Sequence, residues 1–240
     1  GRERLTVLDS TSNYPSNRDR RAGAPAGLLL VLFFSSGATA LIYEVVWRRM
    51  LALTVGGSIY ATSLVLAAFM GGLALGAIVV GRRADSWTNP LRAYAFIELA
   101  AGLFGTLILI GMPVVRALYA SMAGVLPASP VTANLLRAPV VLAILLPPTF
   151  LMGATFPVMT RYYLSIKPAV GRGLGELYAV NTAGAVAGTV LAGIILIRSL
   201  GVVGTSLVAI ALSFAIGLAA LLVSKKTGTA GTSGHTTDRA

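Results

Sequence analysis

IYATSLVLAAFMGGLALGAIVV, residues 59–80, is a run of 22 residues without a charged side chain. A run of this length and apolarity is typical of a helix that crosses the ~30 Å hydrocarbon core of a membrane. Arg82 and Arg83 follow it after one glycine, and basic residues gather on the cytoplasmic side of membrane helices. The stretch therefore predicts a transmembrane helix that ends in the cytoplasm.

Other stretches of about 20 residues have the same character, and together they predict an all-α integral membrane protein with six transmembrane helices. The six spans lie near residues 27–47, 59–80, 91–111, 135–157, 177–197 and 202–223. Residues 112–131 are less apolar and contain three prolines, so we expect an interfacial segment there. The polar stretches 1–25 and 225–240 are predicted to be tails of a membrane domain of residues 26–224, the second tail being disordered.

The composition excludes several classes of function. Hydrophobic residues make up 56% of the chain and charged residues 11%, whereas soluble domains carry about 25% charged residues. The mean hydropathy is +0.82. The chain has no cysteine, and its one histidine, His235, lies in the polar C-terminal tail. Disulfides, thiolate metal sites, His-ligated haem and Ser-His-Asp catalysis in the membrane are thereby excluded, and we expect no catalytic residue, metal or cofactor.

The basic residues indicate the orientation. The net charge is +11, and in the six-span arrangement fourteen of the 19 Lys and Arg residues lie on the side of both termini. This distribution predicts a multi-pass protein of a bacterial-type inner (cytoplasmic) membrane with both termini cytoplasmic. Because orientation and anionic lipid account for the charge, we expect no nucleic-acid partner. The expected partners are the lipid bilayer and other membrane subunits or further copies of the chain.

The two halves of the chain share short sequences in the same order. GAT at 37–39 recurs at 153–155, and YA at 60–61 recurs at 178–179. In both halves the span that opens with YA also contains a GxxxG motif, at 72–76 and at 184–188. Three spans are an odd number, so two copies of a three-span unit have opposite orientations in the membrane. The pattern predicts a 3+3 inverted repeat, the relation found within each six-helix half of major-facilitator transporters.

Four stretches resemble the membrane domain of fused spermidine synthase-like proteins, in which several spans precede a soluble aminopropyltransferase domain. They are SGATALIYEVVWR at 36–48, GGLALG followed by GRRAD at 71–85, LMGATFP at 151–157 and GELYAVNTAGA at 175–185. In that family the transferase domain carries the glycine-rich loop and the acidic residues that hold the polyamine and decarboxylated S-adenosylmethionine. No such loop or acidic cluster follows the sixth span here. The resemblance therefore implies the membrane part of that family without its catalytic domain.

The spacing of Gly171, Gly173 and Gly175 matches part of a dinucleotide-binding loop, but no strand precedes these residues, so the βαβ setting is missing. We expect them to form a flexible turn before the fifth span.

Glu98 is the strongest candidate for a binding residue, because ionisable groups within membrane helices are costly and often functional. It lies seven residues inside the third predicted span, which corresponds to a depth of ~10 Å. Asn181 and Tyr178 have comparable depths in the fifth span. A Glu–Asn–Tyr cluster would bind a cation or a proton. In the alternative interpretation Glu98 only fastens helices together through one of these residues or Arg82.

Glu44 and Arg137 form a second candidate group near the outer surface. Arg48 follows Glu44 at i+4, a spacing that permits an ion pair, and Arg137 is another possible partner. Interfacial anchoring, with Trp47 in the aromatic belt, explains the group without activity. A ligand contact in an outer vestibule is the alternative.

Four glycines are expected to pack helices closely, since small residues one turn apart let backbones approach. They are Gly72, Gly76, Gly184 and Gly188. Pro147 and Pro148 remove two amide donors in the fourth span and predict a bend there.

These observations leave three functional hypotheses. The first is a noncatalytic membrane domain or accessory subunit of a membrane assembly. The second is a small major-facilitator-like transporter of a cation or polyamine. The third is the membrane anchor of an aminopropyltransferase that is separately encoded or removed.

Overall fold

A computed structural model describes residues 24–55, 59–84, 86–122, 130–167 and 169–229. These residues form helices and no strands, which confirms the all-α prediction. The elements are α1 (Ala26–Val55), α2 (Ile59–Ala84), α3 (Pro90–Met122), α4 (Pro130–Ile166), α5 (Val170–Val190), the π-helical segment η1 (Leu191–Leu196) and α6 (Ile197–Thr229). Most of both predicted tails lies outside the described residues.

Five of the described segments are long and apolar enough to cross a membrane. They are Ala26–Leu53, Thr62–Ala84, Pro90–Ser121, Ala138–Ile166 and Val170–Lys226. The helices are therefore those of a multi-pass membrane protein. The last segment holds 57 residues, which as one straight helix would measure ~85 Å, far more than a bilayer requires.

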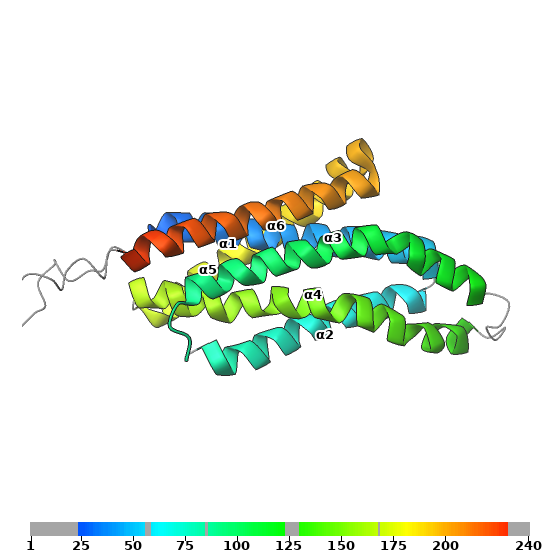
Figure 1. Cartoon of the computed structure of the whole chain (residues 1–240), viewed down its shortest axis with the longest axis horizontal. Coiled ribbons are helices and arrows are strands. Elements are labelled where there is room, and N and C mark those ends of the chain that lie inside the picture. Colours follow the sequence, from blue (N-terminus) through cyan, green and yellow to red (C-terminus); the bar gives the residue numbers. More distant parts are fainter. Residues whose placement is uncertain (1–23, 56–58, 85, 123–129, 168, 230–240) are drawn as a thin grey trace, which may run out of the picture.

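Gly201 interrupts this long segment. Its backbone has φ 67° and ψ −178°, a conformation that is essentially restricted to glycine because a Cβ atom would be strained there. The chain bends at this point, so that α5 and the remainder of α6 run in opposite directions (Figure 1). The break lies between the fifth and sixth predicted spans.

Three helix pairs make the largest contacts in the bundle, namely α2 with α4, α1 with α5, and α3 with α6. Contacts of α3 with α4 and of α1 with α6 come next. The start of α1 and the end of α6 lie at the same end of the bundle (Figure 1), here called the terminal end. Helices α1, α3, α4 and α6 thus surround the middle of the bundle, where the candidate site lies.

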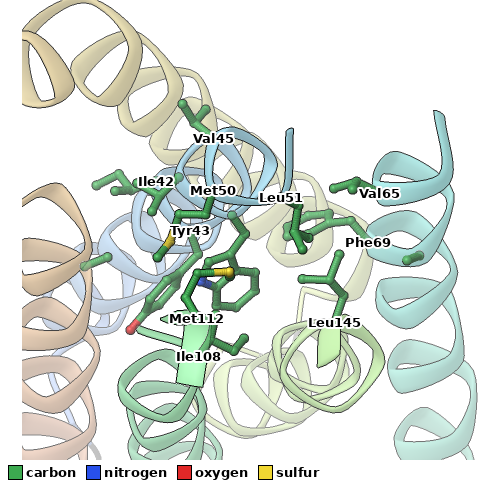
Figure 2. Packing of buried hydrophobic residues seen from close by; sticks show 14 of the residues in the cluster. Ile42, Tyr43, Val45, Met50, Leu51, Val65, Phe69, Ile108, Met112 and Leu145 are labelled. Atoms are coloured by element: carbon green, nitrogen blue, oxygen red, sulfur yellow. The ribbon is translucent and has the colours of Figure 1, made fainter. Parts of the chain in front are cut away.

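Two clusters of buried apolar side chains fill the bundle, one towards each end. The terminal-end cluster includes Leu29, Leu91, Tyr163 and Leu177. The far-end cluster takes residues from the end of α1, the start of α2, the second half of α3 and the first half of α4 (Figure 2). Buried polar residues lie between the two clusters, among them Ser36, Thr39 and Glu98.

The far-end cluster corrects two predictions. Trp47, expected in the aromatic belt, is only 2% exposed and stacks on Tyr43 with ring centroids 4.8 Å apart. Met112 and Tyr119, expected in an interfacial segment, are 2% and 5% exposed, because α3 continues as a helix to Met122. Their side chains pack on neighbouring helices rather than on lipid headgroups.

The turn that was predicted before the fifth span is not present in the structure. Gly171, Gly173 and Gly175 belong to α5, which begins at Val170, so they form helix and not a turn. Pro147 and Pro148 lie inside α4, and the helix continues on both sides of them.

Candidate functional site

A small cavity with a mostly apolar surface and a few polar groups lies in the middle of the bundle, between the two apolar clusters. Its volume, taken as the space open to the centre of a water molecule, is about 10 Å³, which is close to the minimum for one water. Helices α1, α3, α4 and α6 all contribute to its wall. The lining residues are Ser36, Thr39, Ala40, Tyr43, Glu98, Ala101, Met152, Thr155 and Ser213.

The cavity is far from both ends of the bundle. Glu98 follows the first residue of α3, Pro90, by eight positions, and Ser36 follows the first residue of α1, Ala26, by ten. At 1.5 Å per residue these positions are ~12 Å and ~15 Å from the terminal end. For a hydrocarbon core of ~30 Å, the cavity lies near mid-membrane.

Among the nine lining residues Glu98 alone has an ionisable carboxyl group, and it is 3% exposed. The hydroxyl of Ser36 on α1 donates a hydrogen bond to Glu98 Oε1 over 2.5 Å. Tyr94, one turn earlier on α3, is fully buried, and its hydroxyl donates to the carbonyl of Leu32 over 3.3 Å. A buried carboxyl group thus joins α3 to α1 at membrane depth.

The threonines of the cavity direct their protons away from it. Thr39 donates its hydroxyl proton to the carbonyl of Ser35 over 2.8 Å, and Thr155 donates to the carbonyl of Met152 over 2.7 Å. Since each hydroxyl has one proton and two lone pairs, both side-chain oxygens remain available as acceptors. The few polar atoms at the cavity surface are therefore oxygens, and most of that surface is apolar.

Tyr43 supplies the polar group that is left without a partner. Its side chain is fully buried, and its hydroxyl makes no hydrogen bond with any described residue. The ring extends from α1 at the edge of the far-end cluster (Figure 2) and passes over Gly105 of α3, where an added Cβ would lie 2.5 Å from the hydroxyl oxygen. The glycine makes room for the tyrosine to reach the cavity. Buried polar groups normally have a partner, so this hydroxyl marks the cavity as a place for a ligand or water.

Sequence reasoning identified Glu98 but missed its neighbours. Ser36, Thr39 and Tyr43 are spaced by three and four residues, which places them along one face of α1. This stripe of hydroxyls in an apolar helix was a usable signal. Ser213 shares its predicted span with Thr205 and Ser206, and the sequence gave no reason to prefer it over them.

The predicted Glu98–Asn181–Tyr178 cluster does not form. Asn181 lies against Gly37, where an added Cβ would be 2.7 Å from the amide oxygen Oδ1. Tyr178 is 64% exposed, and its ring packs edge-on against Phe156 with the ring centroids 6.4 Å apart. Consecutive residues on a helix point about 100° apart, so Ser36 faces α3 while Gly37 faces α5. Helix α1 therefore separates Glu98 from both partners, and Ser36 takes their place.

The outer group is formed in part. Glu44 and Arg48 make the ion pair that the spacing permits, with 3.7 Å between Oε1 and Nε. The side chain of Arg137 lies outside the described residues. Arg82, a suggested partner of Glu98, is exposed in the last turn of α2.

The four packing glycines lie against the backbone or side chains of a partner helix. An added Cβ would be 1.8 Å from Thr149 Oγ1 at Gly72 and 1.9 Å from the carbonyl oxygen of Phe150 at Gly76. Gly184 and Gly188 lie equally close to α1, with 2.0 Å to the carbonyl oxygen of Phe34 and 2.1 Å to that of Ala38. Any side chain at these positions would push the helices apart.

A second polar group joins α4 to α5 at the terminal end. Lys167 Nζ donates to Glu176 Oε2 over 2.9 Å and to the hydroxyl of Tyr163 over 3.2 Å, and Tyr163 donates to the same carboxylate oxygen over 2.8 Å. The hydrogen bonds to Glu176 and Tyr163 raise the pKa of Lys167. The group is half-exposed and acts as a fastener of the α4–α5 connection.

The fold and the site define a multi-pass α-helical membrane protein with a water-sized cavity in its core. Within the described ranges no three His, Cys, Asp or Glu side chains come together as a metal site. The chain matches no protein-family model, no curated protein and no solved structure.

Proposed function

We propose that this chain is a noncatalytic integral-membrane domain that serves as an accessory subunit of a membrane assembly. The observation that carries the proposal is the small size of the space inside the described bundle. The central cavity has a volume of about 10 Å³, so a polyamine or another organic substrate has no room there. The resemblance to the membrane part of spermidine synthase-like proteins supports the same role.

The proposal includes six crossings arranged as a 3+3 inverted repeat with both termini cytoplasmic. The contact pattern supports it, because exchanging α1 with α4, α2 with α5 and α3 with α6 turns each large contact into another one. The α2–α4 contact becomes the α5–α1 contact, and the α3–α4 contact becomes the α6–α1 contact. The α3–α6 contact becomes itself. The bend at Gly201 supplies the boundary between the fifth and sixth crossings.

Individual glycine contacts support the same exchange. Gly76 of α2 packs on the carbonyl of Phe150 in α4, and Gly184 of α5 packs on the carbonyl of Phe34 in α1. This pairing makes Gly184 the counterpart of Gly76. The order of the two GxxxG motifs in the sequence pairs Gly184 with Gly72, which lies one helical turn before Gly76.

A second pair of contacts has the same spacing along the chain. Gly153 of α4 packs on the carbonyl of Leu73, and Gly37 of α1 packs on the carbonyl of Asn181. Gly37 and Gly153 are separated by the same number of residues as Phe34 and Phe150, and Leu73 and Asn181 by the same number as Gly76 and Gly184. Equal spacings in two independent contacts are what a repeated three-helix unit produces.

The accessory role is tested by photo-crosslinking in the native membrane. A photoreactive amino acid replaces one outward residue on each of three helices, namely Ile78, Leu107 and Val186, which are 52%, 54% and 60% exposed. Leu145, which is fully buried, is the matched control and should react only within the chain. We expect at least one outward position to yield a covalent adduct with a distinct membrane protein. Adducts with lipid or with a second copy alone, at all three positions, would refute the accessory role.

A small major-facilitator-like cation transporter is the second candidate, and the position of the cavity favours it. Transporters built from inverted repeats have their sites near the bilayer midplane between the repeats, and Glu98 of α3 and Thr155 of α4, one from each proposed repeat, both line the central cavity. A membrane anchor for an aminopropyltransferase rests on the resemblance alone. Mass analysis of the complex purified at native expression levels separates the three, since a distinct membrane partner, a homo-oligomer and a soluble transferase have different masses.

A further inference from the structure

We infer that Glu98 is a proton-binding site: its carboxyl group is neutral in the folded chain at neutral pH, and it exchanges its proton with water through the central cavity. This inference is independent of the accessory role, because it concerns a group inside the bundle and not a partner outside it.

The surroundings of Glu98 suit a neutral group better than a charged one. Among the nine residues that line the cavity there is no Lys, Arg or His, and most of the cavity surface is apolar. Glu98 itself is 3% exposed. An ionised carboxylate at membrane depth is costly unless a cation pairs with it, and a buried acid avoids that cost by keeping its proton.

The hydrogen bonds around the carboxyl group fit a neutral acid, which has one accepting carbonyl oxygen and one donating O–H group. The hydroxyl of Ser36 donates to Oε1 over 2.5 Å, so Oε1 takes the part of the carbonyl oxygen. The hydroxyl of Tyr94 lies within hydrogen-bonding reach of the same carboxyl group. Because Tyr94 gives its own proton to the carbonyl of Leu32 over 3.3 Å, its oxygen is an acceptor for the proton of Glu98.

The cavity supplies a place for the water that exchanges this proton. Its surface is partly open, and its volume of about 10 Å³ admits about one water molecule. Thr39 and Thr155 line it and donate their own protons to backbone carbonyls, so their oxygens can accept hydrogen bonds from that water. The apolar remainder of the surface does not compete for it.

Two other titratable groups border this site, Tyr94 on α3 and Tyr43 on α1. The lining residues of α4 and α6 are Met152, Thr155 and Ser213, which do not titrate. A tyrosine in water loses its proton at about pH 10, so both tyrosines are neutral at pH 7. No charged neighbour among these residues therefore forces Glu98 to ionise.

The test is infrared spectroscopy of the purified full chain in a detergent without ester groups. A protonated carboxyl group has a C=O stretching band that is separate from the bands of a carboxylate. At pH 7 the exposed carboxyl groups of the chain are ionised, so the band of a buried neutral acid stands alone. We expect this band at pH 7 and a shift to lower frequency in D₂O as the carboxyl proton exchanges. Absence of the band, or a band that does not shift in D₂O, would overturn the proposal.

Two variants assign the band to one residue. Glu98→Gln should remove it, and the fold should survive because Gln donates and accepts hydrogen bonds in the same places as the neutral acid. Glu44→Gln is the matched control and should retain the band, since Glu44 pairs with Arg48 and is not among the residues that line the cavity. A band that persists in Glu98→Gln, or that is lost in Glu44→Gln, would contradict the assignment.

A second pair of variants leaves the carboxyl group in place. Ser36→Ala removes the hydrogen bond to Oε1, so the C=O band should move to higher frequency. Ser35→Ala changes the neighbouring serine, which is outside the cavity lining, and should leave the frequency unchanged. Equal frequencies in these two variants would show that the observed acid is not the one bonded to Ser36.

Discussion

A methyl group at Gly76 should force α2 away from α4. A Cβ added at this position would lie 1.9 Å from the carbonyl oxygen of Phe150 and 3.0 Å from the amide nitrogen of Ala154. Real Cβ atoms essentially never approach within 3.0 Å, so the backbones must separate by about 1.1 Å. The obstacle is main chain, which cannot rotate away as a side-chain end would.

The size of the effect follows from what holds the two helices together. Between membrane helices there is no hydrophobic drive, and close van der Waals packing supplies most of the attraction. A gap of 0.5–1 Å loses about a quarter to a half of that attraction for each contact, and overpacking typically costs 1–3 kcal/mol. Alanine regains about 1 kcal/mol of helix propensity over glycine. We expect the overpacking to win, with Gly76→Ala destabilising the bundle by about 1 kcal/mol, which is a typical overpacking cost of about 2 kcal/mol less the gain in helix propensity.

Gly71 provides a control in the same helix. An added Cβ there would meet nothing within 4 Å, so Gly71→Ala should be neutral or stabilising by up to about 1 kcal/mol. Unfolding in detergent, followed by circular dichroism, compares the two variants with the parent chain. The expected difference of about 2 kcal/mol between the variants corresponds to about 4–8 °C in midpoint for a chain of this size. Equal midpoints for the two variants would refute the close approach of α2 to α4.

Three further outcomes are expected. Single cysteines at Ser86 and Ser129 should be labelled from opposite sides of sealed cells, Ser129 from outside, and labelling of both from outside would contradict cytoplasmic termini. Gly201→Ala should destabilise the chain by about 1–3 kcal/mol, because an alanine at φ 67° and ψ −178° is strained; an unchanged unfolding midpoint would mean that the bend does not need glycine. Lys167→Met should lower the unfolding midpoint slightly and by the same amount at every pH from 6 to 9. The raised pKa of Lys167 means that its contribution is fully present below the ordinary value of 10.5 and is lost only as pH rises above it, so a loss between pH 6 and 9 would count against this ion pair.

Of the nine residues that line the cavity, only Glu98 was identified as a site residue from the sequence. Glu98 was identified because a charged residue in an apolar span is rare and costly. Its hydrogen-bond partner Ser36 was not, because Asn181 and Tyr178 have similar depths and depth alone does not specify which helix face is turned inward. Trp47 shows the same limit, since an aromatic residue near a span end is compatible with the lipid interface and with the bundle core.

The sequence by itself determined the all-helical class and the apolar segments that can cross a membrane, because apolar run length and helical hydrogen bonding are local properties that the bilayer requires of every span. It also indicated which glycines permit close packing. Only the tertiary structure decided that α1 lies between Glu98 and Asn181, and that Tyr43 reaches across Gly105 into the cavity. These arrangements depend on which faces of distant helices meet. Adjacent residues of a helix point about 100° apart, so Ser36 lines the cavity while its neighbour Gly37 packs on α5.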